Sequence, residues 1–192
     1  RERKLPVIIV RFFNTVGPRQ SGRYGMVIPN FVRQALSGQP ITVFGDGSQS
    51  RAFTHVADVV RGLVALLEQP AAIGQVINLG ALEEITILAL AERVKELTGA
   101  SSSVTFVPYD EAYESGFEDM PRRLPNLDKA TALLGYKPEH TIDDILKQVI
   151  EVVGDLESQA EMGGGFLDNG KFRDIASAIE PAEDESYFEK GN

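Results

Sequence analysis

Hydrophobic and polar positions follow different periods along the chain, and each period predicts an element. Residues 7–13 form an apolar run interrupted only by Arg11, which is typical of a strand buried in a parallel sheet. Residues 55–68 instead repeat apolar side chains at helical spacing, with one face formed by Val56, Val59, Val60, Leu63, Leu66 and Leu67. Strands alternate with helices in this way along most of the chain, which predicts an α/β fold with parallel strands.

Proline, threonine and glycine mark the expected boundaries of the other elements. Pro29 stands in the first turn of one helix, Thr86 and Thr141 are expected to cap two others, and Gly135 ends a fourth. A tight turn is expected at residues 45–47. The predicted strands are 7–13, 41–44, 51–54, 76–79 and 104–107, and the predicted helices are 29–36, 55–68, 86–97, 127–134 and 141–153.

The composition is typical of a soluble globular protein. Of the 192 residues, 43% are hydrophobic and 24% are charged. No apolar run approaches the roughly eighteen residues that cross a bilayer, and no secretory signal opens the sequence. The lack of cysteine excludes disulfides and thiolate metal sites within these residues. We therefore expect a cytoplasmic protein that has no membrane partner.

Charge is distributed unevenly along the chain. The formal net charge is −9, which argues against nucleic acid as a partner. Ten of the acidic residues but only three of the basic residues follow Val153. This change predicts two parts, a folded part at residues 1–153 and an acidic, flexible tail at 154–192 with one short helix around 172–179.

Few side chains are candidates for bond-making chemistry. His55 opens a predicted helix and is expected to pack or cap there, whereas His140 lies in a polar loop and is expected to be solvated. The histidines and acids show no metal-ligand spacing, so no metal site is predicted. The sequence contains neither the nucleophile motif of hydrolases nor a P-loop.

Arginines beside glycines and aromatics are the more informative pattern. Arg51 follows the glycine turn closely, and Phe44 directly precedes it. Arginine suits bidentate contact with phosphate, and a phenyl ring can stack on a base. Together with Arg123 and the Asn126 amide, this set suits a nucleoside diphosphate. The alternative is structural, with Arg51 as an ion-pair partner of Asp58 and Phe44 as ordinary core.

Five segments in a fixed order resemble the NAD-dependent epimerase/dehydratase family, the extended short-chain dehydrogenases/reductases (SDRs) that act on nucleotide sugars. The resemblance covers about residues 5–150 and is nearest to UDP-sugar 4-epimerases and UDP-glucuronate decarboxylases. It implies the C-terminal portion of an extended Rossmann-type fold, with the last sheet strands and a small substrate-binding domain. The segments are RFFNTVGPRQ at 11–20, GDGSQSRAFTHVAD at 45–58, NLG at 78–80, RLP at 123–125 and LGYKP at 134–138.

The resemblance implies a role for each matching position. Asn14 would hold the diphosphate or sugar of a UDP-sugar, and Phe12 would lie against the nicotinamide of NAD. Backbone groups of Val27 and Ile28 would flank the nucleotide sugar. The remaining implied substrate contacts are Phe44 stacked on uracil, Arg51 and Arg123 on the diphosphate, and Asn126, where the family usually has Asp, on the ribose.

The family's catalytic apparatus is missing from this sequence. The chain contains no Gly-x-x-Gly-x-x-Gly loop for NAD, and none of its five tyrosines is followed four residues later by lysine. That tyrosine is the family's general base during hydride transfer to NAD. We therefore assign no catalytic residue to this chain and expect it to be inactive alone, with NAD bound mainly by a preceding half.

The resemblance leaves several functions open. The favoured interpretation is the UDP-sugar-binding part of an epimerase that oxidises the sugar at C4 through a transient keto intermediate. UDP-glucuronate decarboxylase and sugar 4,6-dehydratase are alternatives, as is a non-catalytic nucleotide-sugar-binding remnant. A further alternative is an interaction protein that acts through its acidic tail. The full-length protein is expected to be a homodimer.

Overall fold

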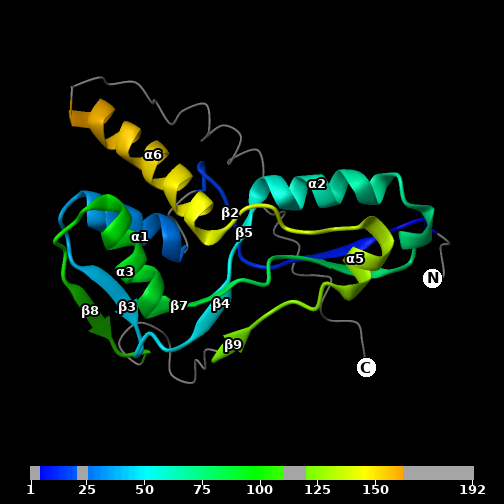
Figure 1. The fold of residues 1–192 in the computed structure, drawn as a ribbon, viewed down its shortest axis with the longest axis horizontal. Helices are drawn as coiled ribbons and strands as arrows, with labels where there is room; N and C mark the ends of the chain where they lie inside the picture. Colours follow the sequence, from blue (N-terminus) through cyan, green and yellow to red (C-terminus); the bar gives the residue numbers. More distant parts are fainter. Residues whose placement is uncertain (1–4, 21–25, 110–119, 162–192) are drawn as a thin grey trace, which may run out of the picture. The chain divides into compact units, whose positions relative to one another are not determined.

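The computed structural model describes residues 5–20, 26–109 and 120–161. Its helices are α1 (Val27–Leu36), α2 (Val56–Leu67), α3 (Ile87–Thr98), α5 (Asp128–Leu134) and α6 (Ile142–Glu161), with one 3-10 turn, η2 (Pro70–Ala72) (Figure 1). Its strands are β1 (Ile9–Phe12), β2 (Thr15–Val16), β3 (Ile41–Phe44), β4 (Ser50–Ala52), β5 (Thr54–His55), β6 (Val76–Leu79), β7 (Glu84–Thr86), β8 (Val104–Val107) and β9 (Arg122–Arg123). None of the helices within these ranges is long and apolar enough to cross a bilayer.

Parallel strand pairs joined by helical crossovers define the architecture, as predicted. β1 pairs with β6, with Ile9 opposite Val76, and β3 pairs with β8, with Ile41 opposite Val104. β2 pairs with β5 in the same sense. β4 lies between an antiparallel neighbour, β7, and a parallel one, β9. Parallel neighbours need long connections, which the helices between them supply.

Two separate clusters of apolar side chains hold these elements together. The large core lies among α1, α3, α6 and β3, and the small core lies among α2, α5 and β6. The large core consists of Val16, Ile28, Phe31, Val32, Ala35, Ile41, Val43, Phe53, Ile87, Leu90, Ala91, Val94, Ile142, Ile145, Leu146 and Val149. The small core consists of Val59, Leu66, Ala72, Ile77, Leu79, Leu127, Ala130 and Tyr136.

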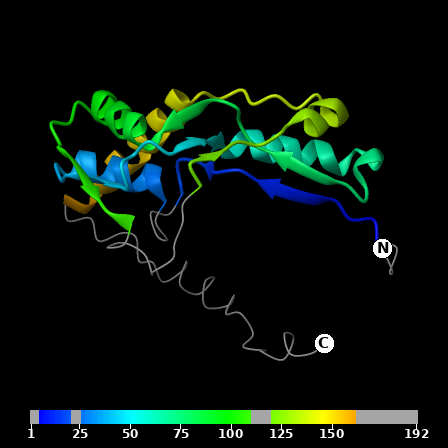
Figure 2. The same cartoon turned by 90° about the horizontal axis from the view of Figure 1, so that it is seen from below.

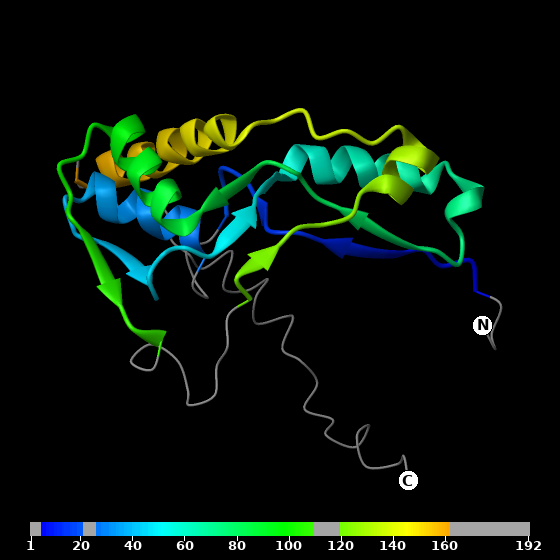
Figure 3. The ribbon, with the colours of Figure 1, turned by 60° about the horizontal axis from the view of Figure 1, so that its bottom comes forward.

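The strand pair β1–β6 has cover on one side only. Figure 2 shows β6 between β1 and α5, and Figure 3 shows both strands beside α2. Among the described residues β1 pairs with β6 alone, and Ile9 and Phe12 are 56% and 50% exposed. The prediction that the strand at 7–13 is buried is therefore wrong, because one edge and one face of β1 contact no other described element.

Helix α2 also departs from its predicted packing. Val59 and Leu66 are buried as expected, but Val56, Val60 and Leu67 are exposed. The helix is apolar nearly all round, so periodicity alone did not identify the face that packs on β6. Gly62 marks the contact face, because a Cβ there would lie 2.9 Å from the Leu79 methyl groups.

Two histidines join the start of α2 to the loop before α6. As predicted, His55 caps α2, since its Nδ1 accepts from the backbone N–H of Ala57 at 3.1 Å. The prediction that His140 is solvated is wrong, because its ring stacks on His55 with centroids 4.0 Å apart. Its Nδ1 also lies 3.1 Å from the buried carboxylate of Asp58. No local sequence pattern indicates this contact between distant segments.

The last helix runs further than its sequence pattern predicted. α6 continues through Gly154 to Glu161, past the change in composition at Val153. The chain divides into two units, Arg1–Leu156 and Glu157–Asn192. Most of the predicted tail, including the short helix expected around 172–179, lies outside the described residues.

Candidate functional site

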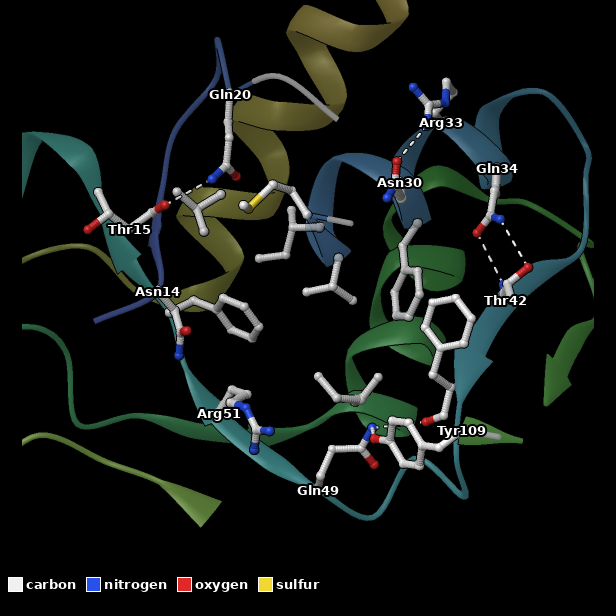
Figure 4. A pocket seen from close by; sticks show the side chains of 18 residues that line it. Asn14, Thr15, Gln20, Asn30, Arg33, Gln34, Thr42, Gln49, Arg51 and Tyr109 are labelled. Carbon is white, nitrogen blue, oxygen red and sulfur yellow. Dashed lines mark hydrogen bonds between the residues drawn. The ribbon is translucent and has the colours of Figure 1, made fainter. Parts of the chain in front are cut away.

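A cavity of about 560 Å³ opens over the large core at the carboxyl ends of β1, β3 and β8 (Figure 4). Its apolar wall includes large-core side chains, namely Val16, Ile28, Phe31, Phe53 and Ile87. Its polar wall consists of Asn14, Thr15, Gln20, Asn30, Arg33, Gln34, Thr42, Gln49, Arg51 and Tyr109. The structure thus brings together five of the predicted substrate residues, which are Asn14, Val27, Ile28, Phe44 and Arg51.

Asn14 lies where β1 ends and the chain turns towards β2. Its φ of 37° is the one positive value among the described non-glycine residues, and asparagine tolerates this region better than most side chains. The side-chain Nδ2 donates to Ala52 O at 2.9 Å, and Asn14 O accepts from the Thr54 backbone N–H. These two bonds tie the end of β1 to the β4–β5 segment and place Asn14 in the cavity wall.

Phe44 and the glycine turn after it form another part of the wall. Gly45 and Gly47 have φ of 69° and 74°, which is the left-handed region that the sequence predicted for a tight turn. Gln49 closes the turn, since its Nε2 donates to Phe44 O at 3.0 Å and to the Tyr109 hydroxyl at 2.8 Å. The Tyr109 ring packs on Gly45, where a Cβ would lie 2.4 Å from it.

Arg51 contributes a positive charge to the cavity wall. It lies on β4, lines the cavity and donates to Ser50 O at 2.7 Å. No ion pair joins Arg51 to Asp58, although the structure describes both residues. The predicted pairing of Arg51 with Asp58 is therefore wrong, because Asp58 pairs with Arg61 and His140 instead.

The amino end of α1 faces the same cavity. Val27 and Ile28 are its first two residues, and the side chain of the N-cap residue, Met26, forms no capping hydrogen bond. The first N–H groups of a helix lack partners within it and carry partial positive charge. No acidic residue lies in the first turn of α1. This end of the cavity therefore favours an anionic group.

Gln34 fixes α1 against β3 on the far side of the cavity. Its Oε1 accepts from the Thr42 backbone N–H, and its Nε2 donates to Thr42 Oγ1, both at 3.1 Å. Figure 4 shows this pair opposite Gln20 and Asn14. Gln34 of α1 thus accepts a hydrogen bond from a backbone N–H of β3, and this contact keeps the strand at a defined distance from α1.

Three predicted site residues lie outside the cavity wall. Arg123 pairs in register with Arg51 across β9 and β4, and its guanidinium lies 5.6 Å from the Phe13 ring centre. The Asn126 side chain forms two hydrogen bonds with Asp128. Its Oδ1 accepts from the Asp128 backbone N–H at 2.9 Å, and its Nδ2 donates to the Asp128 carboxylate. Phe12 is half exposed at the end of β1. Arg123 is therefore a neighbour of the cavity, whereas the side chain of Asn126 serves the start of α5.

An ion pair links strands β9 and β7, which flank β4, next to Arg51 and Arg123. Arg122 on β9 forms a two-pronged contact with Glu84 on β7, and Glu84 also accepts from Ser50 Oγ at 2.9 Å. The hydrogen bonds from Arg122 and Ser50 hold the pKa of Glu84 below its ordinary value. The three strands are thereby locked together, which fixes the spacing of the neighbouring arginines Arg51 and Arg123.

Several wall residues were not identified from sequence. Gln20 and Gln49 fall inside the recognised segments but carry no predicted role. Gln34, Thr42 and Tyr109 face the cavity only because α1 and β8 pack beside β3, and no local pattern predicts that contact. Within the described ranges, no group of three acidic or histidine side chains could hold a metal ion.

The chain is an α/β protein whose cavity lies beyond the carboxyl ends of parallel strands, which is where doubly wound proteins bind their ligands. Residues 1–80 match the NAD dependent epimerase/dehydratase family. The resemblance predicted from the five segments is thus confirmed, and the chain is related to that family.

Two curated relatives are named as decarboxylases. The chain is 38% identical over 155 residues to UDP-N-acetyl-alpha-D-glucosaminuronate decarboxylase of Bacillus cytotoxicus, covering 80% of this chain and 48% of that protein. It is 38% identical over 161 residues to UDP-glucuronic acid decarboxylase 1 of Danio rerio, covering 83% of this chain and 37% of that one. The chain therefore spans about half or less of these curated relatives.

Solved structures confirm the predicted fold class. The UDP-glucuronic acid 4-epimerase of Bacillus cereus, in complex with UDP-glucuronic acid and NAD, superposes with a TM-score of 0.71 at 33% identity. The match covers 79% of this chain and 46% of that one. An epimerase from Methanothermobacter thermautotrophicus gives a TM-score of 0.72 at 34% identity, with 83% and 46% covered. These neighbours are extended Rossmann-type epimerases.

Proposed function

We propose that this chain binds a UDP-sugar and forms the substrate side of an NAD-dependent epimerase or decarboxylase. The observation that carries the proposal is that Asn14, Phe44 and Arg51 line one cavity. Asn14 is distant in sequence from Phe44 and Arg51, so folding brings it to them, and all three were expected to contact substrate. The names of the relatives, which are UDP-uronate decarboxylases and 4-epimerases, support the same ligand class.

The chemistry of the wall fits the parts of a nucleotide sugar. Phe44, which is 36% exposed, supplies an aromatic ring for uracil. The amino end of α1, at Val27 and Ile28, and the Arg51 guanidinium supply donors for a diphosphate. Arg123, beside Arg51 in the sheet, adds a second cation at the edge of the cavity. We retain Asn126 as a ribose contact through its backbone or a rearranged side chain.

The residues that would hold NAD in this chain are few. Phe12, half exposed at the carboxyl end of β1, presents a flat apolar ring that fits contact with a nicotinamide. NAD supplies reversible hydride transfer, which would act at C4 of the sugar. The sequence holds neither the glycine-rich loop nor the tyrosine–lysine pair. We therefore expect this chain to bind and orient substrate without converting it.

A binding titration tests the proposal directly. The 192-residue chain should bind UDP-glucuronic acid in isothermal titration calorimetry. Arg51→Met should weaken binding by about 10- to 100-fold, because a hydrogen bond to a charged group is lost. The same change at Arg93, which pairs with Asp143 away from the cavity, is the matched control and should leave affinity unchanged.

Two results would count against the proposal. Equal losses of affinity in the Arg51 and Arg93 variants would indicate a general effect on folding. Turnover of UDP-glucuronic acid by the chain with added NAD, followed by product chromatography, would contradict the absence of catalytic residues.

Decarboxylation is a second candidate reaction for the complete protein, because two decarboxylases share 38% identity with this chain. Both reactions would begin with oxidation at C4. Release of carbon dioxide from carboxyl-labelled UDP-glucuronic acid, measured on a protein of the relatives' full length, separates decarboxylation from epimerisation.

A further inference from the structure

Two buried polar atoms in the cavity wall, Gln20 Oε1 and Thr15 Oγ1, lack a partner among the described residues. The Gln20 side chain donates from Nε2 to Thr15 O at 3.0 Å (Figure 4). A carbonyl oxygen only accepts, so this bond fixes which end of the amide is nitrogen. The other end, Oε1, is buried, and no donor in the described part of the chain reaches it. The cavity wall therefore contains a buried acceptor whose missing hydrogen bond a ligand could supply.

Such an atom is unfavourable unless a donor reaches it, since nearly all buried polar atoms in folded proteins are paired. Thr15 Oγ1 is also buried without a partner in the described residues. A hydroxyl can rotate and can act as donor or acceptor, so its needs are easily met. Gln20 Oε1 can only accept, which makes a donor on the ligand its specific requirement.

The type of donor follows from the parts of the ligand. A diphosphate carries acceptors only at neutral pH, so it cannot satisfy Gln20. The base-stacking ring of Phe44 belongs to the glycine-turn side of the cavity, where Figure 4 places Gln49 and Tyr109, away from Gln20. The ribose is bonded to the base and lies with it, whereas the sugar beyond the diphosphate offers several hydroxyl donors of its own. We propose that Gln20 selects the sugar of the ligand by accepting a hydrogen bond from one of its hydroxyl groups at Oε1.

Asn14 points to the same end of the ligand. Its Nδ2 is used by Ala52 O, so the amide offers Oδ1, a second acceptor, to the cavity. Two amide oxygens, at Asn14 and Gln20, thus lie on the side of the wall next to β2. The donors at the start of α1 and at Arg51 address phosphate instead. This assignment rests on the UDP-sugar function proposed above.

The first experiment compares UDP with UDP-glucose on two variants of the chain. Gln20→Met keeps the length of the side chain and removes both polar atoms. It should weaken binding of UDP-glucose by about 5- to 20-fold and change binding of UDP by less than about twofold, as expected for one lost hydrogen bond. Gln39→Met, the same change at an exposed position, should alter neither affinity.

A second measurement identifies the hydroxyl. UDP-glucose analogues that each lack one sugar hydroxyl are titrated against the wild-type chain and against Gln20→Met. The analogue without the contacted hydroxyl should lose about 5- to 20-fold in the wild type and no further affinity in the variant. This non-additivity would not appear if Gln20 merely supported the loop at residues 15–20.

The outcomes separate this inference from the proposed function. Wild-type binding of UDP-glucose with no loss in Gln20→Met would overturn the role of Gln20 and leave the UDP-sugar function intact. Equal losses for UDP and UDP-glucose would overturn it as well, since the contact would then belong to the nucleotide or to folding. Failure of the folded wild-type chain to bind either ligand would overturn both.

Discussion

The helices around the large core and helix α2 beside the small core expose their apolar side chains to different extents. In the large core, helices α1, α3 and α6 surround β3, and Ile145 and Leu146 are fully buried. Beside the small core, α2 buries Val59 but leaves Val60 and Val64 about half exposed, at 51% and 54%. The same types of residue are therefore enclosed in one region and open to solvent in the other.

This difference matches the position of the cavity. Five large-core residues form its apolar wall, so the walls of the site belong to the better packed region. Close packing holds side chains in fixed positions, and a binding site needs such fixed positions. Asn14, at the end of β1, ties the site to the strand pair of the small core.

The largest expected effect comes from a cavity made in the large core. Leu146→Ala, at a fully buried position of α6, should lower the free energy of unfolding by about 2–5 kcal/mol. Leu67→Ala, the same change on α2 where the side chain is 85% exposed, should alter it by less than about 0.5 kcal/mol. Urea denaturation of both variants measures the contrast, and similar losses would contradict it.

A smaller effect is expected at Asp58, where contacts join α2 to the loop before α6. Its buried carboxylate accepts from the backbone N–H groups of Glu139 and His140 at 3.2 and 3.1 Å, and pairs with Arg61. Asp58→Asn should cost about 1.5–3 kcal/mol, because hydrogen bonds to a charged group are lost. Urea denaturation at neutral pH measures this cost.

The dependence on pH sharpens the test of Asp58. Burial alone would raise its pKa, but the hydrogen bonds from His140, Glu139 and Arg61 outweigh burial and leave the pKa below the ordinary 3.8. The native state then binds the proton less readily than the unfolded state. The stabilisation is present above about pH 4 and is lost as the pH falls further. The Asp58→Asn variant should lack this part of the acid dependence, and an unchanged acid limb would contradict the assignment.

The smallest effect is expected inside the small core. The Tyr136 hydroxyl donates to Gly80 O at 3.1 Å, and burial, followed by the charge of Asp58, raises its pKa to about 12. Tyr136→Phe should cost about 1 kcal/mol. Because the native pKa exceeds the ordinary 10, the wild type should also lose stability between about pH 10 and 12. Thermal melts across that range should show a smaller fall for Tyr136→Phe.

Much of the fold could be predicted from sequence because local signals agreed with the tertiary structure. Strands 41–44, 76–79 and 104–107 match β3, β6 and β8 residue for residue. Each is a short apolar run bounded by glycine, proline or polar residues. The exposed face of α2 and the stacking of His140 on His55 could not be predicted, because they depend on segments that are distant in sequence.

The site shows the same division. Phe44, Arg51 and Asn14 could be proposed because they lie in recognisable segments, and the cavity does bring them together. Which of these residues contact a ligand stays a prediction. The bonds between Gln34 and Thr42 could not be foreseen, since nothing in residues 26–44 shows how α1 lies on β3. The buried oxygen of Gln20 required the geometry of the whole wall.

The pairing of β1 with β6 also affects how the chain folds while it is being synthesised. Ile9 pairs with Val76, so the partner of β1 is synthesised long after β1 itself. At roughly 5–20 residues per second, translation leaves β1 waiting for several seconds before β6 emerges. Throughout that interval the apolar residues at 7–13 lack the strand with which they pair in the folded chain. A chaperone that binds extended apolar segments therefore has a long opportunity to hold this one.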